Sequence, residues 1–233
     1  MKAWMRCALA LTVGLLLSVG SASAALVAGR DYVVLAKPMP VKSGNKIEVI
    51  EVFWYGCPHC YRLDPLLNQW IGKLPADVSF RRVPAAFANN PSWSPLARLY
   101  YALEDTGELR LHPEVFDAVH RDHINLNNPN LLREWLASKT MSGARIAQSM
   151  NSPKVSANLA DSIKYVAEAK IDGVPTIVID GKYATGAEKL GEGEALINAV
   201  NELIAKARAE RKTAAKPAAK SATTPAATAP AKK

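Results

Sequence analysis

Cys57 and Cys60 are the residues that could most readily do chemistry, and they lie in the segment EVFWYGCPHCYRLDP, residues 51–65. Two cysteines separated by two residues could be a structural staple, half of a metal site or a reactive disulfide. As a staple, the pair closes so small a loop that it removes little entropy from the unfolded chain. Together with His59 the pair supplies only part of a tetrahedral set of metal ligands. We therefore interpret the pair as a redox-active disulfide.

The residues around the cysteines predict a strand that gives way to a helix. The segment KIEVIEVFWY, residues 46–55, is dense in β-branched and aromatic residues, which is typical of a central strand. The spacing of apolar residues then predicts a helix from Pro58 to about Gly72. Cys57 would lie at the start of this helix, where unpaired backbone N–H groups favour an anion. Because the thiolate is the nucleophilic form of cysteine, this position predicts an activated Cys57.

Cys60 differs from Cys57 in its surroundings. It shares a helical stripe with Leu63 and Leu67, so its side chain is expected to turn inward, away from solvent. We expect Cys57 to exchange disulfides with other molecules, attacking or being attacked, and Cys60 to resolve the mixed disulfides that result.

Pro58 and His59 separate the two cysteines. Pro58 is well tolerated at the first position of a helix, where a backbone N–H would have no partner. A protonated His59 would add positive charge beside a Cys57 thiolate and favour the dithiol over the disulfide. Each pKa unit below the ambient pH stabilises the reduced form by about 1.4 kcal/mol, which is about 30 mV for a two-electron couple. The alternative is that His59 is only a solvated residue at the helix start.

Glu51 lies in the middle of the predicted central strand, six residues before Cys57. A buried carboxylate is costly unless it has a partner or stays protonated. It could exchange a proton with Cys60 when a mixed disulfide resolves. Alternatively, it could form an ion pair with Arg81 or Arg82, or lie at an exposed position.

The dipeptide Val174-Pro175 opens a later strand, after a turn at Asp172-Gly173. A proline at the start of a strand can be an ordinary trans residue at the boundary. It can also carry a cis peptide bond, which is rare even before proline. The dipeptide alone favours the trans interpretation.

The rest of the chain indicates an α/β fold with a helical insert. Residues 77–83 read as a second strand that completes a β-α-β unit with a crossover long enough for parallel pairing. Residues 91–170 lack strand signals, and three pairs of a capping residue and a proline predict helix starts there: Ser94-Pro95, Asn128-Pro129 and Ser152-Pro153. Residues 174–186 predict a hairpin that turns at Asp180-Gly181, and a last helix is expected over about 190–205.

The first 24 residues have the layout of a secretory signal peptide. Lys2 and Arg6 precede an apolar stretch that ends near Val19, and small residues follow up to Ala24. The alternative, an uncleaved membrane anchor, is disfavoured because a spanning helix needs about 20 apolar residues. Cleavage would leave Cys57 and Cys60 as the only cysteines of a mature chain in an oxidising compartment.

Residues 206–233 have the Ala-, Lys- and Pro-rich composition of a disordered tail. The whole chain has a formal net charge of +8, but the basic excess lies in this tail, and residues 25–205 are about neutral. We therefore expect no nucleic-acid-binding surface on the folded domain, which spans residues 25–205.

The combination of FWYGCPHC after a strand, a helical insert and GVPT before the next strand resembles the thioredoxin superfamily, specifically the DsbA-type thiol:disulfide oxidoreductases. The resemblance covers about residues 30–205. It implies a thioredoxin-like fold with an inserted helical sub-domain at about 91–170. It also implies an exposed nucleophile at Cys57 and a resolving thiol at Cys60. Glu51 would be the buried acid beside them. Val174-Pro175 would be cis and face the disulfide, with the Val174 backbone holding an extended substrate.

These residues and the resemblance together predict a monomeric periplasmic dithiol oxidase without a cofactor or metal. It would donate the Cys57-Cys60 disulfide to reduced, unfolded secreted proteins. The resemblance further implies a quinone-linked, DsbB-like membrane partner that reoxidises the dithiol. The nearest alternative is a thiol reductase or disulfide isomerase on the same scaffold, against which Pro58 and His59 argue. A metal-carrying protein and a non-catalytic adhesin are the alternatives from other classes.

Overall fold

The structure is a computed structural model that describes residues 25–220, with side chains described up to residue 214. The predicted signal peptide, residues 1–24, and residues 221–233 of the predicted tail lie outside the described residues. Within the described part, no helix is both long and apolar enough to cross a membrane.

A mixed five-stranded sheet forms the centre of the fold, with the strands in the order β1-β5-β4-β2-β3. Their bounds are β1 (Val33–Val34), β2 (Ile47–Phe53), β3 (Val78–Pro84), β4 (Thr176–Ile179) and β5 (Tyr183–Gly186). Every residue of β2 is buried, as expected for a central strand. β2 runs parallel to β3 and antiparallel to β4. The predicted β-α-β unit is thus confirmed, with helix α1 (Pro58–Ile71) as its crossover.

The predicted hairpin is formed by β4 and β5. Asp180 and Gly181 at its turn have φ angles of 54° and 63°, the left-handed values that such a tight turn requires. Asn and Asp adopt this region more readily than most residues, and glycine does so without steric cost.

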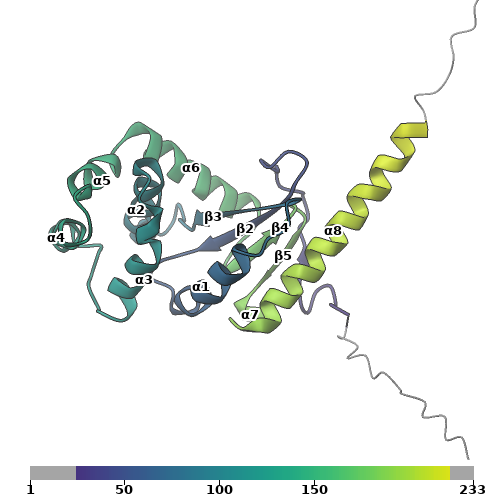
Figure 1. The fold of residues 1–233 in the computed structure, drawn as a ribbon, viewed down its shortest axis with the longest axis horizontal. Coiled ribbons are helices and arrows are strands. Elements are labelled where there is room, and N and C mark those ends of the chain that lie inside the picture. The colour runs from purple at the N-terminus through teal and green to yellow at the C-terminus, as the bar shows by residue number, and fades with distance from the viewer. Residues whose placement is uncertain (1–24, 221–233) are drawn as a thin grey trace, which may run out of the picture.

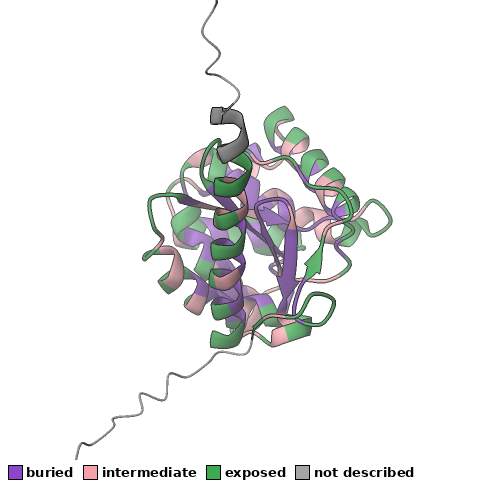
Figure 2. Ribbon diagram, turned by 90° about the vertical axis from the view of Figure 1, so that its right-hand side faces the viewer, coloured by how far each residue is buried: buried purple, intermediate pink, exposed green. Residues whose placement is uncertain are grey.

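Helices cover both faces of the sheet (Figure 1). On one face, α1 and the C-terminal helix α8 (Glu194–Lys220) pack against alternate residues of β2 and β4, among them Val49 and Ile177. On the other face, α6 (Pro153–Glu168) contributes Val166 to a cluster with Ile50 and Val178. Figure 2 shows this arrangement from the side, with the buried strands behind the exposed outer side of the C-terminal helix.

The predicted helical insert is present and closes the end of the sheet where β2 leads into α1 (Figure 1). It contains five α-helices: α2 (Ser94–Thr106), α3 (His112–His120), α4 (Pro129–Lys139), α5 (Gly143–Ser149) and α6. Short 3₁₀ helices directly precede α2 and α3, at Pro91–Trp93 and Leu109–Leu111. Asn128 and Ser152 cap α4 and α6 through their side chains, as predicted. Ser94 starts α2 without capping it, because the 3₁₀ turn before it already continues into the helix.

The predicted end of the folded domain at residue 205 is wrong. After α7 (Ala187–Leu190), α8 continues without a break to Lys220. Ala207 is fully buried, Arg208 Nε donates to Asp77 at 2.6 Å, and Arg211 pairs with Asp180. The Ala- and Lys-rich composition that suggested disorder is also that of good helix formers. These tertiary contacts, together with the pairing of Glu210 with Lys182 and Tyr183, hold the first part of the segment in the helix.

Candidate active site

Cys57 is the N-cap residue of α1, directly after the turn that follows β2. Its backbone N–H donates to the carbonyl of Trp54 at 2.9 Å, and its own carbonyl accepts from the N–H of Tyr61 at 3.1 Å. Gly56 allows the indole of Trp54 to fold back over the turn, because a Cβ at this position would collide with that ring. Pro58 occupies the first helical position, as predicted. The sequence thus builds the turn that presents the Cys57 sulfur at a helix start.

The two thiols differ in burial and in proton affinity. Both cysteines are free thiols in this structure. Cys60 has no exposed surface and Cys57 is 7% exposed. The resemblance implied an exposed Cys57, and the structure corrects this: only an edge of the residue reaches solvent, and Cys57 belongs to the buried cluster that the insert contributes to.

The pKa of Cys57 is lowered to about 6, chiefly by a hydrogen bond from the Cys60 thiol. The backbone N–H groups of Cys60 and His59 and the charge of His59 act in the same direction, against the opposing effect of burial. Burial raises the pKa of Cys60 well above its usual value, and the nearby Cys57 and Glu51 add to the rise. The pair therefore holds one stabilised thiolate and one thiol that keeps its proton.

The Val174-Pro175 peptide bond is cis, as the resemblance implied and contrary to what the dipeptide alone favoured. The Val174 carbonyl accepts a hydrogen bond from the Cys57 thiol at 3.3 Å. This segment is 117 residues away in the chain, yet it lies against the reactive sulfur.

Glu51 combines two of the alternatives left open by the sequence. It is 1% exposed, and its carboxylate accepts from Arg82 Nε at 2.8 Å. Burial nevertheless raises the pKa of Glu51 to about 7, since it outweighs the opposing charge of Arg82. Arg81 points to the other face of the sheet, where it pairs with Glu48. Glu51 is therefore an ion-paired carboxyl group that can also take up a proton near neutral pH.

Three further buried polar residues join this site, and the sequence analysis did not identify them. The Tyr55 hydroxyl lies 2.8 Å from His112 Nδ1, and His112 Nε2 lies 3.3 Å from Asp64. Asp64 in turn accepts from Arg82 at 3.0 Å, which links the group to Glu51. A carboxylate on the apolar stripe of α1, four residues after Cys60, was the available signal for Asp64. His112 is brought in by α3 and has no such signal.

His59 is half-exposed, with a side-chain exposure of 53%, but it is not merely solvated. Its Nδ1 lies 3.3 Å from a carboxylate oxygen of Glu192 and 2.9 Å from Arg62 Nη2. Glu192 belongs to the loop between α7 and α8, so the C-terminal part of the chain reaches the histidine between the two cysteines.

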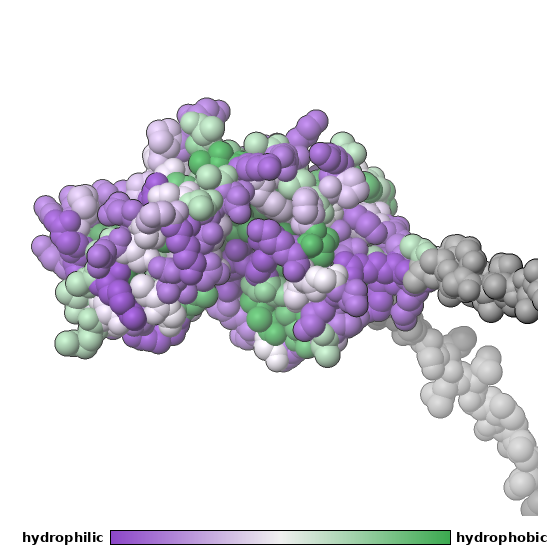
Figure 3. All heavy atoms as spheres, turned by 90° about the horizontal axis from the view of Figure 1, so that it is seen from above, coloured by the Kyte–Doolittle hydropathy of each residue, from purple (hydrophilic) through white to green (hydrophobic). Residues whose placement is uncertain are grey.

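A cavity of about 560 Å³ lies beside His59 and the cis-proline segment. Its lining includes His59, Val174 and Pro175 together with Val33 and Leu35 of the N-terminal segment. On the face of the molecule shown in Figure 3, hydrophilic side chains dominate and hydrophobic ones gather only in small patches.

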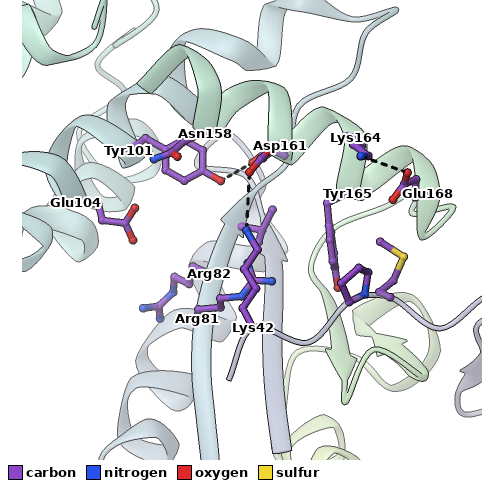
Figure 4. Close-up of a pocket in the computed structure, with 14 residues that line it drawn as sticks. Lys42, Arg81, Arg82, Tyr101, Glu104, Asn158, Asp161, Lys164, Tyr165 and Glu168 are labelled. Carbon is purple, nitrogen blue, oxygen red and sulfur yellow. Dashed lines mark hydrogen bonds and ion pairs between the residues drawn. The ribbon is translucent and has the colours of Figure 1, made fainter. Parts of the chain in front are cut away.

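A second cavity, of about 320 Å³, lies between β3 and the insert and reaches the active-site network only through Arg82. Figure 4 shows that charged side chains around it pair with one another, Lys42 with Asp161 and Lys164 with Glu168. Within the described residues, no group of three or more His, Cys, Asp or Glu side chains is placed to hold a metal ion.

Comparison with known proteins places these features in a family context. Residues 48–197 match the family model described as DSBA-like thioredoxin domain. The chain is 38% identical over 186 residues to the thiol:disulfide interchange protein DsbA of Pseudomonas aeruginosa, covering 79% of this chain and 87% of the relative. It is 39% identical over 181 residues to the DsbA of Azotobacter vinelandii, covering 77% and 84%.

Solved structures agree with the sequence matches. The crystal structure of Pseudomonas aeruginosa DsbA superposes with a TM-score of 0.76 at 37% identity, covering 80% of this chain and 97% of that one. The oxidoreductase NmDsbA1 from N. meningitidis superposes with a TM-score of 0.72 at 31% identity, covering 82% and 98%.

Proposed function

This chain belongs to the family of DsbA-like thioredoxin domains and is a thiol:disulfide oxidoreductase, and from that premise we propose that it introduces disulfides into reduced, unfolded secreted proteins in the periplasm. The observation that carries the proposal is the position of Cys57 at the start of α1 beside the buried Cys60 thiol, which lowers the pKa of Cys57 to about 6 while Cys60 keeps its proton. A thiolate stabilised in the dithiol form makes the disulfide form the less favoured one, so the disulfide is readily transferred.

The reaction transfers two electrons from substrate to protein. A substrate thiolate attacks the sulfur of Cys57, the Cys57–Cys60 bond breaks, and Cys60 leaves as a thiolate that takes up a proton. A second substrate thiolate then attacks the substrate sulfur of the mixed disulfide, and Cys57 leaves as the stabilised thiolate. The substrate is oxidised to a disulfide and the protein is reduced to the dithiol. A thiol of low pKa leaves fast, so the second step gains most from the site.

Glu51 would donate a proton to Cys60 and accept it back in this scheme. A carboxyl group whose pKa is about 7 can give a proton to the leaving Cys60 and accept it again during reoxidation. In reoxidation, the Cys57 thiolate attacks a partner's disulfide, and the deprotonated Cys60 then attacks Cys57 and releases the partner as a dithiol. A quinone-linked, DsbB-like membrane protein is the proposed partner.

Substrate would bind along the cis-proline segment. The Val174 backbone lies against the Cys57 sulfur, and the neighbouring cavity carries apolar side chains from the N-terminal segment. An extended peptide could pair with this backbone and place a side chain in the cavity. We further propose that residues 1–24 are a signal peptide that is removed and that the mature protein acts as a monomer.

Equilibration with glutathione tests the oxidase proposal. Alkylation of free thiols followed by mass spectrometry gives the fraction of dithiol at fixed ratios of reduced to oxidised glutathione. We expect the dithiol to predominate even where oxidised glutathione is abundant, because the thiolate stabilises it. A protein that remains a disulfide until glutathione is almost entirely reduced would be a reductase, and the proposal would be rejected.

A further inference from the structure

We propose that Glu192 and Arg62 are positioning residues that set the charge of His59 and thereby adjust the redox equilibrium of the Cys57–Cys60 pair in opposite directions. The inference rests on the proposed function. It assigns the adjustment of the cysteine pair to two residues outside the Cys-Pro-His-Cys motif.

The three side chains form a closed triangle at the start of α1. Arg62 lies one turn after His59 on the same side of the helix, and its Nη2 is 2.9 Å from His59 Nδ1. Arg62 Nε donates to one oxygen of Glu192, and the other oxygen is 3.3 Å from the same His59 nitrogen. Glu192 stands between Gly191, which has a left-handed φ of 71°, and Gly193.

One proton decides which of the two contacts to His59 is a hydrogen bond. Arg62 can only donate, so its contact requires Nδ1 without a proton and hence a neutral ring. Glu192 can only accept as a carboxylate, so its contact requires a proton on Nδ1, as the imidazolium always has. Arg62 therefore favours neutral His59, and Glu192 favours charged His59.

The redox state of the cysteines influences whether His59 is charged and bonded to Glu192 or neutral and bonded to Arg62. The positive charge of His59 stabilises the Cys57 thiolate, which exists only in the dithiol form. We infer that the dithiol form favours the contact of His59 with Glu192 and that the disulfide form favours its contact with Arg62. Glu192 would then make the protein more oxidising, and Arg62 would make it less so.

A direct effect of each charge on the Cys57 thiolate would have the opposite sign, because the carboxylate of Glu192 would destabilise the thiolate and the guanidinium of Arg62 would stabilise it. The contacts of the two residues indicate that their effect through His59 is the larger one. Both residues bond to His59, and neither forms a hydrogen bond with Cys57 in the described structure. Half of each of the Arg62 and His59 side chains is exposed, so solvent and salt screen the longer interaction more strongly. The cavity beside His59 also carries Lys170, Asp172, Glu188 and Lys189, two charges of each sign.

The test is the glutathione equilibrium constant of the full-length mature protein carrying Glu192→Gln or Arg62→Gln. We expect Glu192→Gln to shift the equilibrium about 2- to 5-fold toward the disulfide and Arg62→Gln to shift it by a similar factor toward the dithiol, the scale of an exposed ion pair. Glu188→Gln removes a carboxylate of the same cavity that forms no hydrogen bond or ion pair with His59 in the described structure, and it is the matched control.

Each substitution is repeated in a His59→Leu background. Opposite shifts that vanish without His59 support the proposal. Shifts of the same sign, no shift, or shifts that persist in His59→Leu overturn it. The potential of the unsubstituted protein tests the oxidase function separately, because the proposal concerns only differences from that value.

Discussion

Serine in place of Cys57 is expected to reduce oxidation of a reduced, unfolded protein to the rate without enzyme. The hydroxyl cannot form the disulfide that is transferred, so the loss is complete rather than partial. Cys60→Ala removes the same disulfide but retains Cys57, whose thiolate is still favoured by the backbone N–H groups at positions 59 and 60 and by the charge of His59. When this variant meets a disulfide-bonded substrate, Cys57 attacks it, and no second thiol is present to release the adduct. Mass spectrometry should then find a stable mixed disulfide at Cys57.

The two substitutions serve as controls for each other. Cys57→Ser retains Cys60, whose thiol is buried and holds its proton, so it should form no adduct. Equal adduct yields in the two variants, or undiminished oxidation by either, would contradict the roles assigned to the two sulfurs.

Glutamine in place of Glu51 is expected to stabilise the dithiol protein at high pH. The pKa of Glu51 is raised from 4.5 to about 7. Between these values the folded protein retains a proton that the unfolded chain has lost, so stability falls as the pH rises from about 4.5 to 7. At pH 8 the buried carboxylate costs up to about 3 kcal/mol relative to a neutral group. Urea unfolding should show a gain for Glu51→Gln of that order at pH 8 and none near pH 4.

The same variant should close its disulfide more slowly, because Cys60 loses its proton acceptor. Glu48→Gln is the matched control, since Glu48 is also buried in β2 and paired with an arginine of β3 but lies on the other face of the sheet. Closure should be unchanged in Glu48→Gln. If Glu51→Gln is instead destabilised equally at both pH values, Glu51 acts only as a structural partner of Arg82.

The elements that place the cysteines could be predicted because their signals are local. The run of β-branched and aromatic residues around Val49 marks a central strand, Pro58 marks a helix start, and Asp180-Gly181 marks a hairpin. These elements contain or adjoin the cysteine pair, His59 and Glu51. Their proximity in the structure could therefore be predicted from their proximity in the sequence.

What could not be predicted depends on contacts between distant segments. Glu192 is 133 residues from His59, and His112 reaches Tyr55 from a separate helix, so no spacing reveals either contact. The end of α8 depends on Arg208 and Arg211 finding Asp77 and Asp180, which local composition does not encode. The burial of Cys57 likewise arises from the packing of the insert against the start of α1.

The stabilised thiolate at Cys57 is the basis of the whole account, and ultraviolet absorbance of the dithiol protein measures it directly. Thiolate absorbance near 240 nm is recorded against pH, with the disulfide form as the blank. We expect one thiolate to appear with a midpoint near pH 6, while Cys60 stays protonated to far higher pH. A first midpoint near pH 9, the value of an ordinary thiol, would contradict the account.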